Sequence, residues 1–463
     1  MIPKRPINAD VPATEEKLGS APAGGKQDDA PAGKGAAPKQ SQETPGKPAL
    51  ASDPPGEKPP RQPKPLAPKL LAALAALAVV FIVVAIVGGS GGKDESKGEV
   101  ATSAPGDNDP SAPAAAEALS FPTFATSNTT RIGGSNPVSN AAGAALAVYP
   151  SVTEAQRPAA VTLAGEEDWA GAIAASVLMA PPVRSPLLFS APDELPEDSE
   201  EALAALAPQG TKASGGASLF AIGPVVLPGD AGQVTRVDSG DPAATAAQIA
   251  TLRDRLFGGP PAHILVASSS SPDFAMPAAA WAARSGDPVL YANAKKLPAS
   301  TAAALRKHPK VPVFVLGPPA AVSTEAFEEI AKIDKRVKRV AGKDPVENAL
   351  ALARYHAGSF GWNVNDPGHG FVLARSDSPA DAAAAAALSA SGTWGPLLLT
   401  DSPDTLPAAL RSYLLDVKPG YTTDPTRAFY NRVWVIGDQA AIGVAQQAEV
   451  NEMAELAKIG GEG

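Results

Sequence analysis

The chain has no cysteine among its 463 residues, so it forms no disulfide, holds no thiolate-bound metal and carries no cysteine nucleophile. Only four histidines are present, and none shows His-x-x-x-His spacing or lies beside a pair of carboxylates. We expect all four, His263, His308, His356 and His369, to be structural or solvated. Aromatic residues are also scarce, at 5% of the total. This composition fits an exported protein that does not rely on oxidative folding.

Serine and glycine motifs for catalysis are incomplete as well. The run Ser268–Ser271 follows an apolar segment but lacks the Gly-x-Ser-x-Gly pattern of a nucleophile elbow. Gly133 and Gly134 lack the Gly-x-Gly-x-x-Gly spacing of a phosphate-binding loop. We expect turns at both places. The sequence therefore predicts that the chain is not an enzyme, and it indicates no metal and no cofactor.

Basic residues are fewer than acidic ones: the chain has 39 Lys and Arg and 48 Asp and Glu, which gives a net charge of −9. The deficit lies beyond residue 69, because residues 1–69 hold eleven basic and eight acidic residues. A nucleic-acid-binding domain normally presents a basic face. An acidic exterior of this kind excludes nucleic acid as the expected partner.

One long hydrophobic run is present, the eighteen uncharged residues from Leu70 to Val87. As a helix it would be about 27 Å long, enough to cross the hydrocarbon core of a bilayer. Lys58, Arg61, Lys64 and Lys69 precede it, and basic residues are retained on the cytoplasmic side. We predict an uncleaved signal-anchor at 70–88, with a cytoplasmic N-terminus. A cleaved signal peptide is the alternative, although such peptides begin at the N-terminus itself.

The segments that flank this run have the composition of unfolded chain. Residues 1–69 lack apolar clusters and are rich in Pro, Gly, Lys and Ala, which predicts a disordered cytoplasmic tail. Its basic residues serve either as a topology signal or as an attraction to anionic lipid. Residues 89–118 are rich in Gly, Ser, Pro and acidic residues, and we expect a flexible linker there.

The rest of the chain contains three internal repeats. Each begins with an Arg followed six residues later by a Pro, and the three Arg are 105 and 103 residues apart. A Pro fits the first turn of a helix, where its missing N–H needs no partner. The three segments are Arg131–Pro137, Arg236–Pro242 and Arg339–Pro345.

Further matching segments follow each Arg segment. The apolar runs 161–164, 263–267 and 370–374 each precede an Ala-rich helix, and a second apolar run then leads to a Leu-Pro that opens another helix. A last apolar run ends in Gly, at 218–223, 311–317 and 432–437. Apolar strands alternating with helices predict parallel sheets covered on both faces. The fold class is therefore α/β, with three tandem small modules that each form an α/β sandwich.

These residues resemble the type 2 cell-wall-binding repeat, a family of exported proteins of Gram-positive bacteria. The third repeat fits best, at Arg339–Asp344, Ala380–Ala382, Pro396–Thr400 and Val435–Gly437. The resemblance covers about residues 126–455 and implies modules packed around a pseudo-threefold axis. It places the repeats at 119–232, 233–336 and 337–463. Only Asp381 keeps the family's Asp before Ala, since Gly171 and Met276 occupy the matching positions.

Ligands of open α/β sheets bind at the carboxyl ends of the strands, beside helix N-termini that favour anions. Basic residues near these ends would suit a phosphate- or uronate-rich polymer, which leads to five candidate binding residues: Arg131, Arg236, Arg339, Lys343 and Arg375. Asp381, which keeps the family's Asp, is the sixth candidate. The alternative for the three repeated Arg is structural, a guanidinium that ties carbonyls or a carboxylate at the sheet edge. Asp168, Asp273 and Asp381 could also act as general acids or bases, but we expect them to cap helix N-termini instead.

Together with the resemblance, these features predict a single-pass membrane protein whose extracellular part faces the cell wall. That part would bind anionic cell-wall polymer or peptidoglycan non-covalently, so that the chain acts as an envelope tether or scaffold. The alternative is an envelope enzyme or small-ligand sensor that reuses the same modules.

Overall fold

The computed structural model describes residues 124–132, 134–391 and 395–459, all within the second of two units, Ala104–Gly463. The predicted tail, membrane-spanning segment and linker at 1–118 lie outside the described residues. Within the described ranges, no helix is both long enough and apolar enough to cross a membrane.

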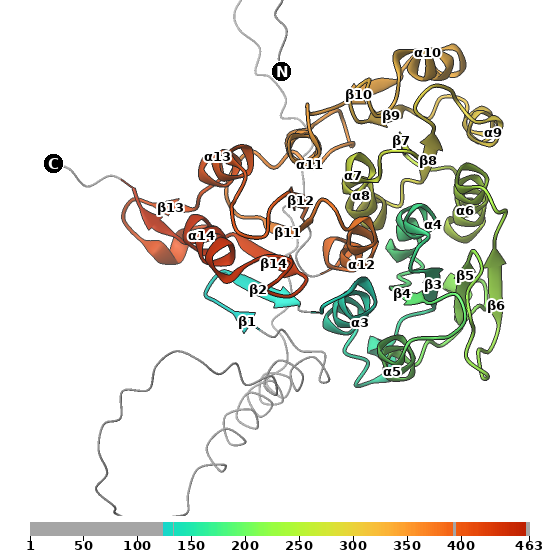
Figure 1. Ribbon diagram of the computed structural model, residues 1–463, viewed down its shortest axis with the longest axis horizontal. Coiled ribbons are helices and arrows are strands. Elements are labelled where there is room, and N and C mark those ends of the chain that lie inside the picture. The colour runs from blue at the N-terminus through green and yellow to red at the C-terminus, as the bar shows by residue number, and fades with distance from the viewer. Residues whose placement is uncertain (1–123, 133, 392–394, 460–463) are drawn as a thin grey trace, which may run out of the picture. The chain divides into compact units, whose positions relative to one another are not determined.

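Three sheets, each with four parallel strands, form the framework of this unit (Figure 1). The first has the order β4 (Leu187–Ser190), β3 (Val161–Gly165), β5 (Leu219–Ile222), β6 (Val234–Val237). The second has the order β8 (Val289–Ala292), β7 (Ile264–Ser268), β9 (Val313–Leu316), β10 (Lys338–Val340). The third has the order β12 (Leu397–Thr400), β11 (Gly370–Arg375), β14 (Arg432–Ile436), β2 (Thr129–Ile132).

Two short additions extend this framework. Strand β1 (Phe124–Ala125) pairs antiparallel with β2 at the edge of the third sheet. Strands β13 (Gly420–Tyr421) and β15 (Ala457–Lys458) form a separate parallel pair. The three main sheets confirm the prediction of tandem α/β modules with parallel strands.

Helices cover the sheets, and many of them begin at a Pro. The first helix of each repeat starts at the Pro that follows the repeated Arg, and the side chains of Asn136, Asp241 and Asp344 cap these three N-termini. An N-cap side chain satisfies an amide that has no partner within the helix. The helices are α3 (Pro137–Val148), α4 (Trp169–Ala175), α5 (Glu197–Leu206), α6 (Pro242–Phe257), α7 (Pro272–Ala275), α8 (Pro277–Ser285), α9 (Ala299–Lys307), α10 (Thr324–Ile333), α11 (Pro345–Arg354), α12 (Pro379–Ala390), α13 (Ala408–Asp416) and α14 (Val444–Ala454).

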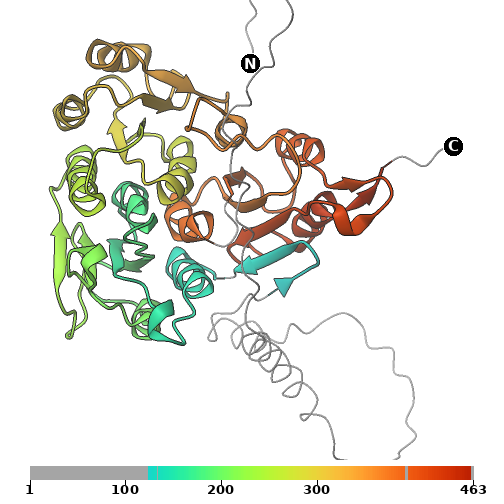
Figure 2. The ribbon, with the colours of Figure 1, turned by 180° about the vertical axis from the view of Figure 1, so that it is seen from behind.

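The sheets are composed differently from the repeats. We expected each repeat to form a sandwich of its own, but the strand that carries the repeated Arg lies in the preceding sheet. Strand β6 completes the first sheet, β10 completes the second, and β2 completes the third, whose other parallel strands lie near the C-terminus. In Figure 2 the cyan β2 accordingly lies against the red β14. The sequence did not reveal this because a strand's pattern shows that it is buried but not which neighbour it pairs with.

The centre of the unit is formed by the Ala-rich helices α4, α8 and α12, with α3 packed beside α12 (Figure 1). Every residue of α12 from Ala380 to Ala390 is buried. Alanine makes this possible because its small side chain lets helix axes approach closely. The central helices can therefore pack directly against one another.

Candidate functional site

Arg131 on β2 is buried, with 1% of its surface exposed. Its guanidinium donates to the carbonyls of Gly437 at 2.8 Å, Asp438 at 2.7 Å and Ile442 at 2.6 Å, and to Oε1 of Gln447 at 2.7 and 3.0 Å. These acceptors lie in the turn after β14 and the first turn of α14. Burial lowers the pKa of Arg131 to about 10, and Asp438 acts in the opposite direction. The geometry supports the structural alternative for this residue.

Arg339 on β10 occupies the same position in the second sheet. It donates to the carbonyls of Gly317 at 2.7 Å and Ser323 at 3.4 Å, and its guanidinium carbon lies 5.0 Å from the ring centroid of Phe327. Phe327 on α10 stands where α14 has Gln447, since each follows its turn glycine by ten residues. Gly317 and Gly437 have φ of +108° and +95°, a conformation that glycine adopts without strain. The turn that each Gly begins surrounds the guanidinium together with the first part of the following helix, and we call this surrounding the socket.

Arg236 on β6 has the same register, opposite Ala221, but no comparable socket. The chain from Gly223 to β6 forms no helix equivalent to α10 or α14. Within the described part of the chain, the side chain of Arg236 is exposed and forms no hydrogen bond or ion pair. Of the three repeated Arg, this one has a guanidinium that is free to contact a ligand.

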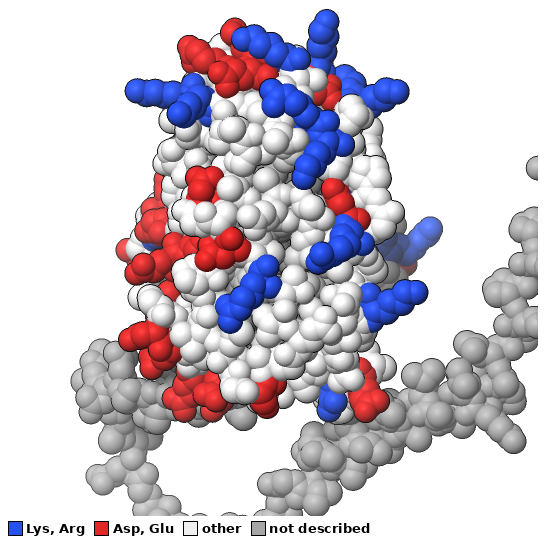
Figure 3. Space-filling model, turned by 90° about the vertical axis from the view of Figure 1, so that its right-hand side faces the viewer, with Lys and Arg blue, Asp and Glu red and all other residues white. Residues whose placement is uncertain are grey.

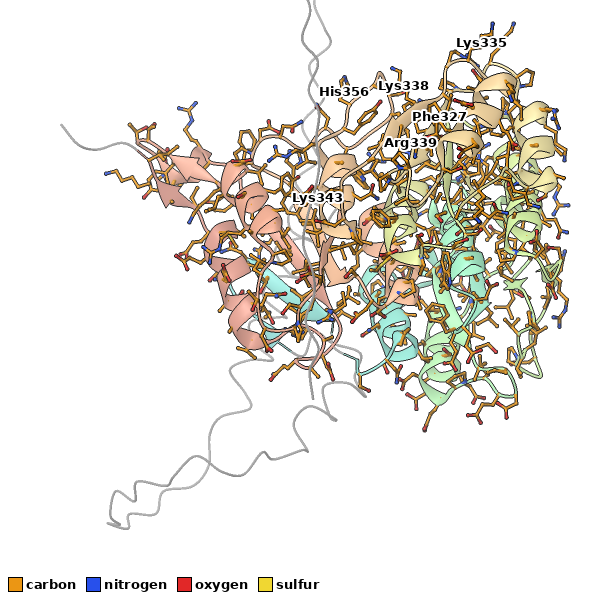
Figure 4. All side chains as sticks on the ribbon, turned by 45° about the horizontal axis from the view of Figure 1, so that its top comes forward. Phe327, Lys335, Lys338, Arg339, Lys343 and His356 are labelled. Atoms are coloured by element: carbon orange, nitrogen blue, oxygen red, sulfur yellow. The ribbon has the colours of Figure 1, made fainter. Side chains whose placement is uncertain are left out.

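Lys343 belongs to a cluster of basic residues, which we call the basic strip, between α10 and α11. Residues 332–343 contain six Lys and Arg and one acidic residue, Asp334. The strip consists of the exposed side chains Lys332, Lys335, Arg336, Lys338 and Lys343 together with the half-buried Arg339. Figure 4 shows Lys335, Lys338, Arg339 and Lys343 along the same part of the fold, with His356 beside them. In Figure 3, blue side chains predominate over the upper part of the visible face and red ones lower down.

Few charges neutralise the basic strip. Arg336 pairs with Asp334, which raises the pKa of Arg336 and lowers that of Asp334. Lys343, with 75% of its side chain exposed, pairs with Glu347 at 2.5 Å. Exposed pairs of this kind contribute little to stability, because water and salt screen them, and they open easily to a competing anion. Among the residues of the strip, Lys332, Lys335 and Lys338 have no ion pair within the described residues.

Arg375 and Asp381 lie in the third sheet and its covering helix. Arg375, at the end of β11, forms a 2.5 Å ion pair with the exposed Asp377. Asp381 lies in the first turn of α12 and is buried, and it accepts a 2.9 Å hydrogen bond from Nδ2 of Asn140 on α3. Burial raises the pKa of Asp381, while Asn140 and Ser378 act in the opposite direction. The four Arg candidates therefore lie on three different sheets, Lys343 lies in the segment before α11, and Asp381 lies on α12.

The capping prediction for three aspartates is confirmed at Asp168 alone. Asp168 is the N-cap of α4 and accepts from the amide of Gly171 at 2.9 Å. Asp273 and Asp381 instead lie inside the first turns of α7 and α12, where Asp273 accepts from the amide of Phe274 at 3.0 Å. Capping is wrong for these two because each helix starts earlier, at a Pro.

His263 is bound on both sides of its ring. Its Nδ1 lies 3.0 Å from Oδ2 of Asp287, and its Nε2 lies 3.2 Å from Oγ of Ser359. This connectivity is that of a serine hydrolase triad. However, the amide after the nucleophile normally helps to form the oxyanion hole, and here the Phe360 amide donates to the carbonyl of Ala357. We therefore regard the three residues as a lock that holds the turn at 357–360 against the second sheet.

Lys335, Lys338 and Ser359 were not among the candidates predicted from the sequence. A signal for the first two was present, because residues 288–343 contain eleven Lys and Arg against four Asp and Glu in an otherwise acidic chain. No signal for Ser359 was available, since its partners His263 and Asp287 come from another repeat.

Three parallel sheets, each completed by a strand that carries the repeated Arg, define a protein built from α/β repeats. Residues 236–327 and 339–446 match the model of Cell wall binding domain 2 (CWB2). The chain therefore contains CWB2 repeats, as the sequence resemblance predicted. CWB2 repeats are cell-wall-binding domains and are not catalytic domains.

Two solved structures share this fold. Cwp8 from Clostridium difficile matches with a TM-score of 0.54 at 19% identity, over 71% of this chain and 52% of that one. Cwp6 from Clostridium difficile matches with a TM-score of 0.53 at 19% identity, over 71% and 47%. The chain thus spans about half the length of each of these proteins. A search of curated proteins found no match.

Proposed function

We propose that the basic strip binds anionic cell-wall polymer and that the chain thereby ties the cell membrane to the wall. The observation that supports this most directly is the concentration of positive charge at residues 332–343 of a protein with a net charge of −9. Local fields of this kind attract polyanions even when the whole molecule is acidic. Arg339 and Lys343 contribute to this site, and the free guanidinium of Arg236 offers a further contact.

The proposal includes the arrangement of the repeats. The three sheets would be related by a pseudo-threefold axis through the central helices, so that each repeat presents its outer edge to the polymer. The basic strip occupies one such edge. A polymer long enough to reach other edges would also meet Arg236, and multivalent contact would strengthen weak single contacts.

Sedimentation with native cell walls tests the binding site. The variant Lys335→Glu/Lys338→Glu/Lys343→Glu should lose most of the wall binding of the full chain, because three cations become anions. The matched control Arg255→Glu/Arg427→Glu/Lys458→Glu changes the net charge equally at exposed positions outside the strip. Binding of the wild type should also weaken as salt rises, since exposed charges are screened over about 8–10 Å at physiological ionic strength.

Equal loss in both variants would show that net charge alone decides binding and would refute the basic strip as the site. Walls from which anionic polymer has been stripped give a second comparison. Undiminished sedimentation with stripped walls would identify peptidoglycan as the ligand in place of the anionic polymer.

The membrane part of the proposal rests on Leu70–Val87 and on the basic residues before it. Protease added to intact protoplasts should digest the repeats and spare an epitope placed in residues 1–60. Digestion of that epitope would contradict the proposed orientation.

A further inference from the structure

A cavity in the first repeat has a charge opposite to that of its surroundings. Residues 124–235 contain eleven Asp and Glu against four Lys and Arg. Two of those four, Arg157 and Arg184, line one cavity of about 490 Å³. No Asp or Glu lines it, and the polar residues that complete its wall are Tyr149, Gln156 and Thr211. Half of the basic residues of this acidic repeat therefore line one cavity whose wall contains no acidic residue.

Arg157 has unused hydrogen-bonding capacity at this cavity. Its Nε is buried and has no hydrogen-bond partner among the described residues. Buried polar groups in folded proteins almost always have a partner, so the unpartnered Nε marks Arg157 as a side chain whose donors the fold itself does not fully use. A guanidinium offers planar, paired donors that match the two oxygens of a carboxylate or the oxygens of a phosphate.

Arg184 is held at the cavity by a strained backbone. Its φ is +54°, in the left-handed region that residues other than glycine rarely adopt. Backbone hydrogen bonds fix this conformation, because the amides of Val183 and Arg184 both donate to the carbonyl of Ala180 at 3.1 Å. Its guanidinium carbon lies 5.8 Å from the ring centroid of Tyr149. Strain of this kind persists where the surrounding structure enforces it, and it is concentrated at binding sites.

Tyr149 supplies the third polar group and an apolar wall. It is buried, and burial raises the pKa of its hydroxyl while Arg184 acts in the opposite direction. The hydroxyl therefore stays protonated at neutral pH and can donate a hydrogen bond. An aromatic ring, two guanidiniums and an amide around a volume of this size suit a single charged sugar better than an extended chain.

We propose that this cavity binds one anionic sugar unit, recognised through its carboxylate or phosphate group by Arg157 and Arg184. The inference rests on the proposed function in one respect: the sugar would be a unit or an end of the wall polymer. It differs in its place, since the cavity lies in the first repeat and the basic strip lies between the second and third. The chain would then hold the polymer at two sites, one that contacts its backbone charge and one that selects a sugar.

Saturation-transfer NMR on the full chain tests the inference with glucuronate, glucose 6-phosphate and neutral glucose as probes. We expect one or both charged sugars to bind and glucose to fail. Which of the two binds distinguishes a carboxylate from a phosphate ligand. The variant Arg157→Gln/Arg184→Gln should weaken binding about tenfold or more, whereas Arg427→Gln, an exposed position outside the cavity, should leave it unchanged.

Binding of glucose as strong as that of the charged sugars, or unchanged binding by the double variant, would overturn the inference. Gln at both positions keeps polar side chains of similar length, and a melting curve identical to that of the wild type confirms folding. Wall sedimentation separates the two proposals. A chain that sediments with walls but binds no charged sugar refutes the cavity alone, and a chain that binds the sugar but no wall refutes the proposed function.

Discussion

The repeated Arg has three different environments at one sequence position, and this makes its contribution to stability measurable. Arg131 is buried with five hydrogen bonds, Arg339 is half-buried with two, and Arg236 is exposed with none within the described residues. Position in a repeat therefore does not determine the role of the residue. The role of each Arg depends on whether a socket surrounds its guanidinium. A socket forms only where a helix follows the neighbouring strand, as α10 follows β9 and α14 follows β14.

Alanine at each of the three positions should give a graded loss of stability. Arg131→Ala leaves buried carbonyls and the side-chain oxygen of Gln447 without a hydrogen-bond donor, so we expect a loss of roughly 3 kcal/mol or more in the free energy of unfolding. Arg339→Ala should cost about 1–2 kcal/mol, and Arg236→Ala less than about 0.5 kcal/mol. Denaturant unfolding of the three variants provides the measurement. Three equal losses would contradict the assignment.

Asp381 predicts a pH dependence of opposite sign to that of a salt-bridged carboxylate. Its pKa is raised by burial, so the folded state binds its proton more tightly than the unfolded state does. The stability it contributes is full below the unfolded pKa of about 3.9 and is lost as pH rises through the folded pKa. At neutral pH, Asp381→Asn should therefore raise the melting temperature, and below pH 4 it should change little.

The amide in this variant still accepts from Nδ2 of Asn140, and it adds a donor beside the unpartnered Oδ1 of Asn140. Asp366→Asn is the matched control, since that side chain is 78% exposed. A lower melting temperature for Asp381→Asn at pH 7 would show that the ionised carboxylate is needed for stability.

Among the elements, the turn after α11 is held by an aromatic cluster that joins two repeats. Phe360 stacks on Phe314 of β9 with ring centroids 3.6 Å apart, and Trp281 of α8 meets its edge at 5.0 Å. We expect Phe360→Ala to reduce the free energy of unfolding by about 3–5 kcal/mol, because a large cavity opens in the cluster. Phe429→Ala, at a ring that is 70% exposed, should change it by less than about 0.5 kcal/mol.

Thermal unfolding compares these two variants. Similar losses of stability in both would show that the aromatic cluster does not hold this turn. Adding Ser359→Ala distinguishes the lock from a catalytic triad. A fluorophosphonate probe should label neither the wild type nor this variant, and labelling that depends on Ser359 would establish a nucleophile.

Most helices and strands could be predicted from the sequence, because local patterns determine them. The helix expected to begin at Pro242 is α6 at Pro242–Phe257, and the apolar run predicted as a strand at 370–374 is β11 at Gly370–Arg375. Helices α10 and α14 were missed, since the repeat unit was taken to end at the strand before them. Sheet membership and the cavity at Arg157 could not be predicted, because both depend on contacts between segments far apart in the chain.

At the scale of the whole molecule, strand β2 connects the two ends of the described fold. It supplies the edge of the third sheet beside β14, and Arg131 fills the socket 316 residues further along the chain. A chain that starts at residue 150 should leave β14 with an unpaired edge, and such edges associate with other chains. We expect this truncated chain to dimerise or aggregate in size-exclusion chromatography with light scattering.

A synthetic peptide of residues 119–148 should restore the monomer when added in trans, because it carries β1, β2 and α3. A peptide of the same length with Arg131→Ala is the control and should restore it poorly. A truncated chain that stays monomeric without peptide would show that the third sheet is stable without β2.

Because β2 pairs with β14, β2 is synthesised long before it can take its place in the third sheet. Ribosomes add about 5–20 residues per second, so the 316 positions between Arg131 and Gln447 correspond to roughly 15–60 s of translation. Throughout that interval β2 has been made but its partner has not. A nascent or prematurely terminated chain would therefore expose an unpaired strand until its last helix was complete, and proteases would remove unfinished copies selectively.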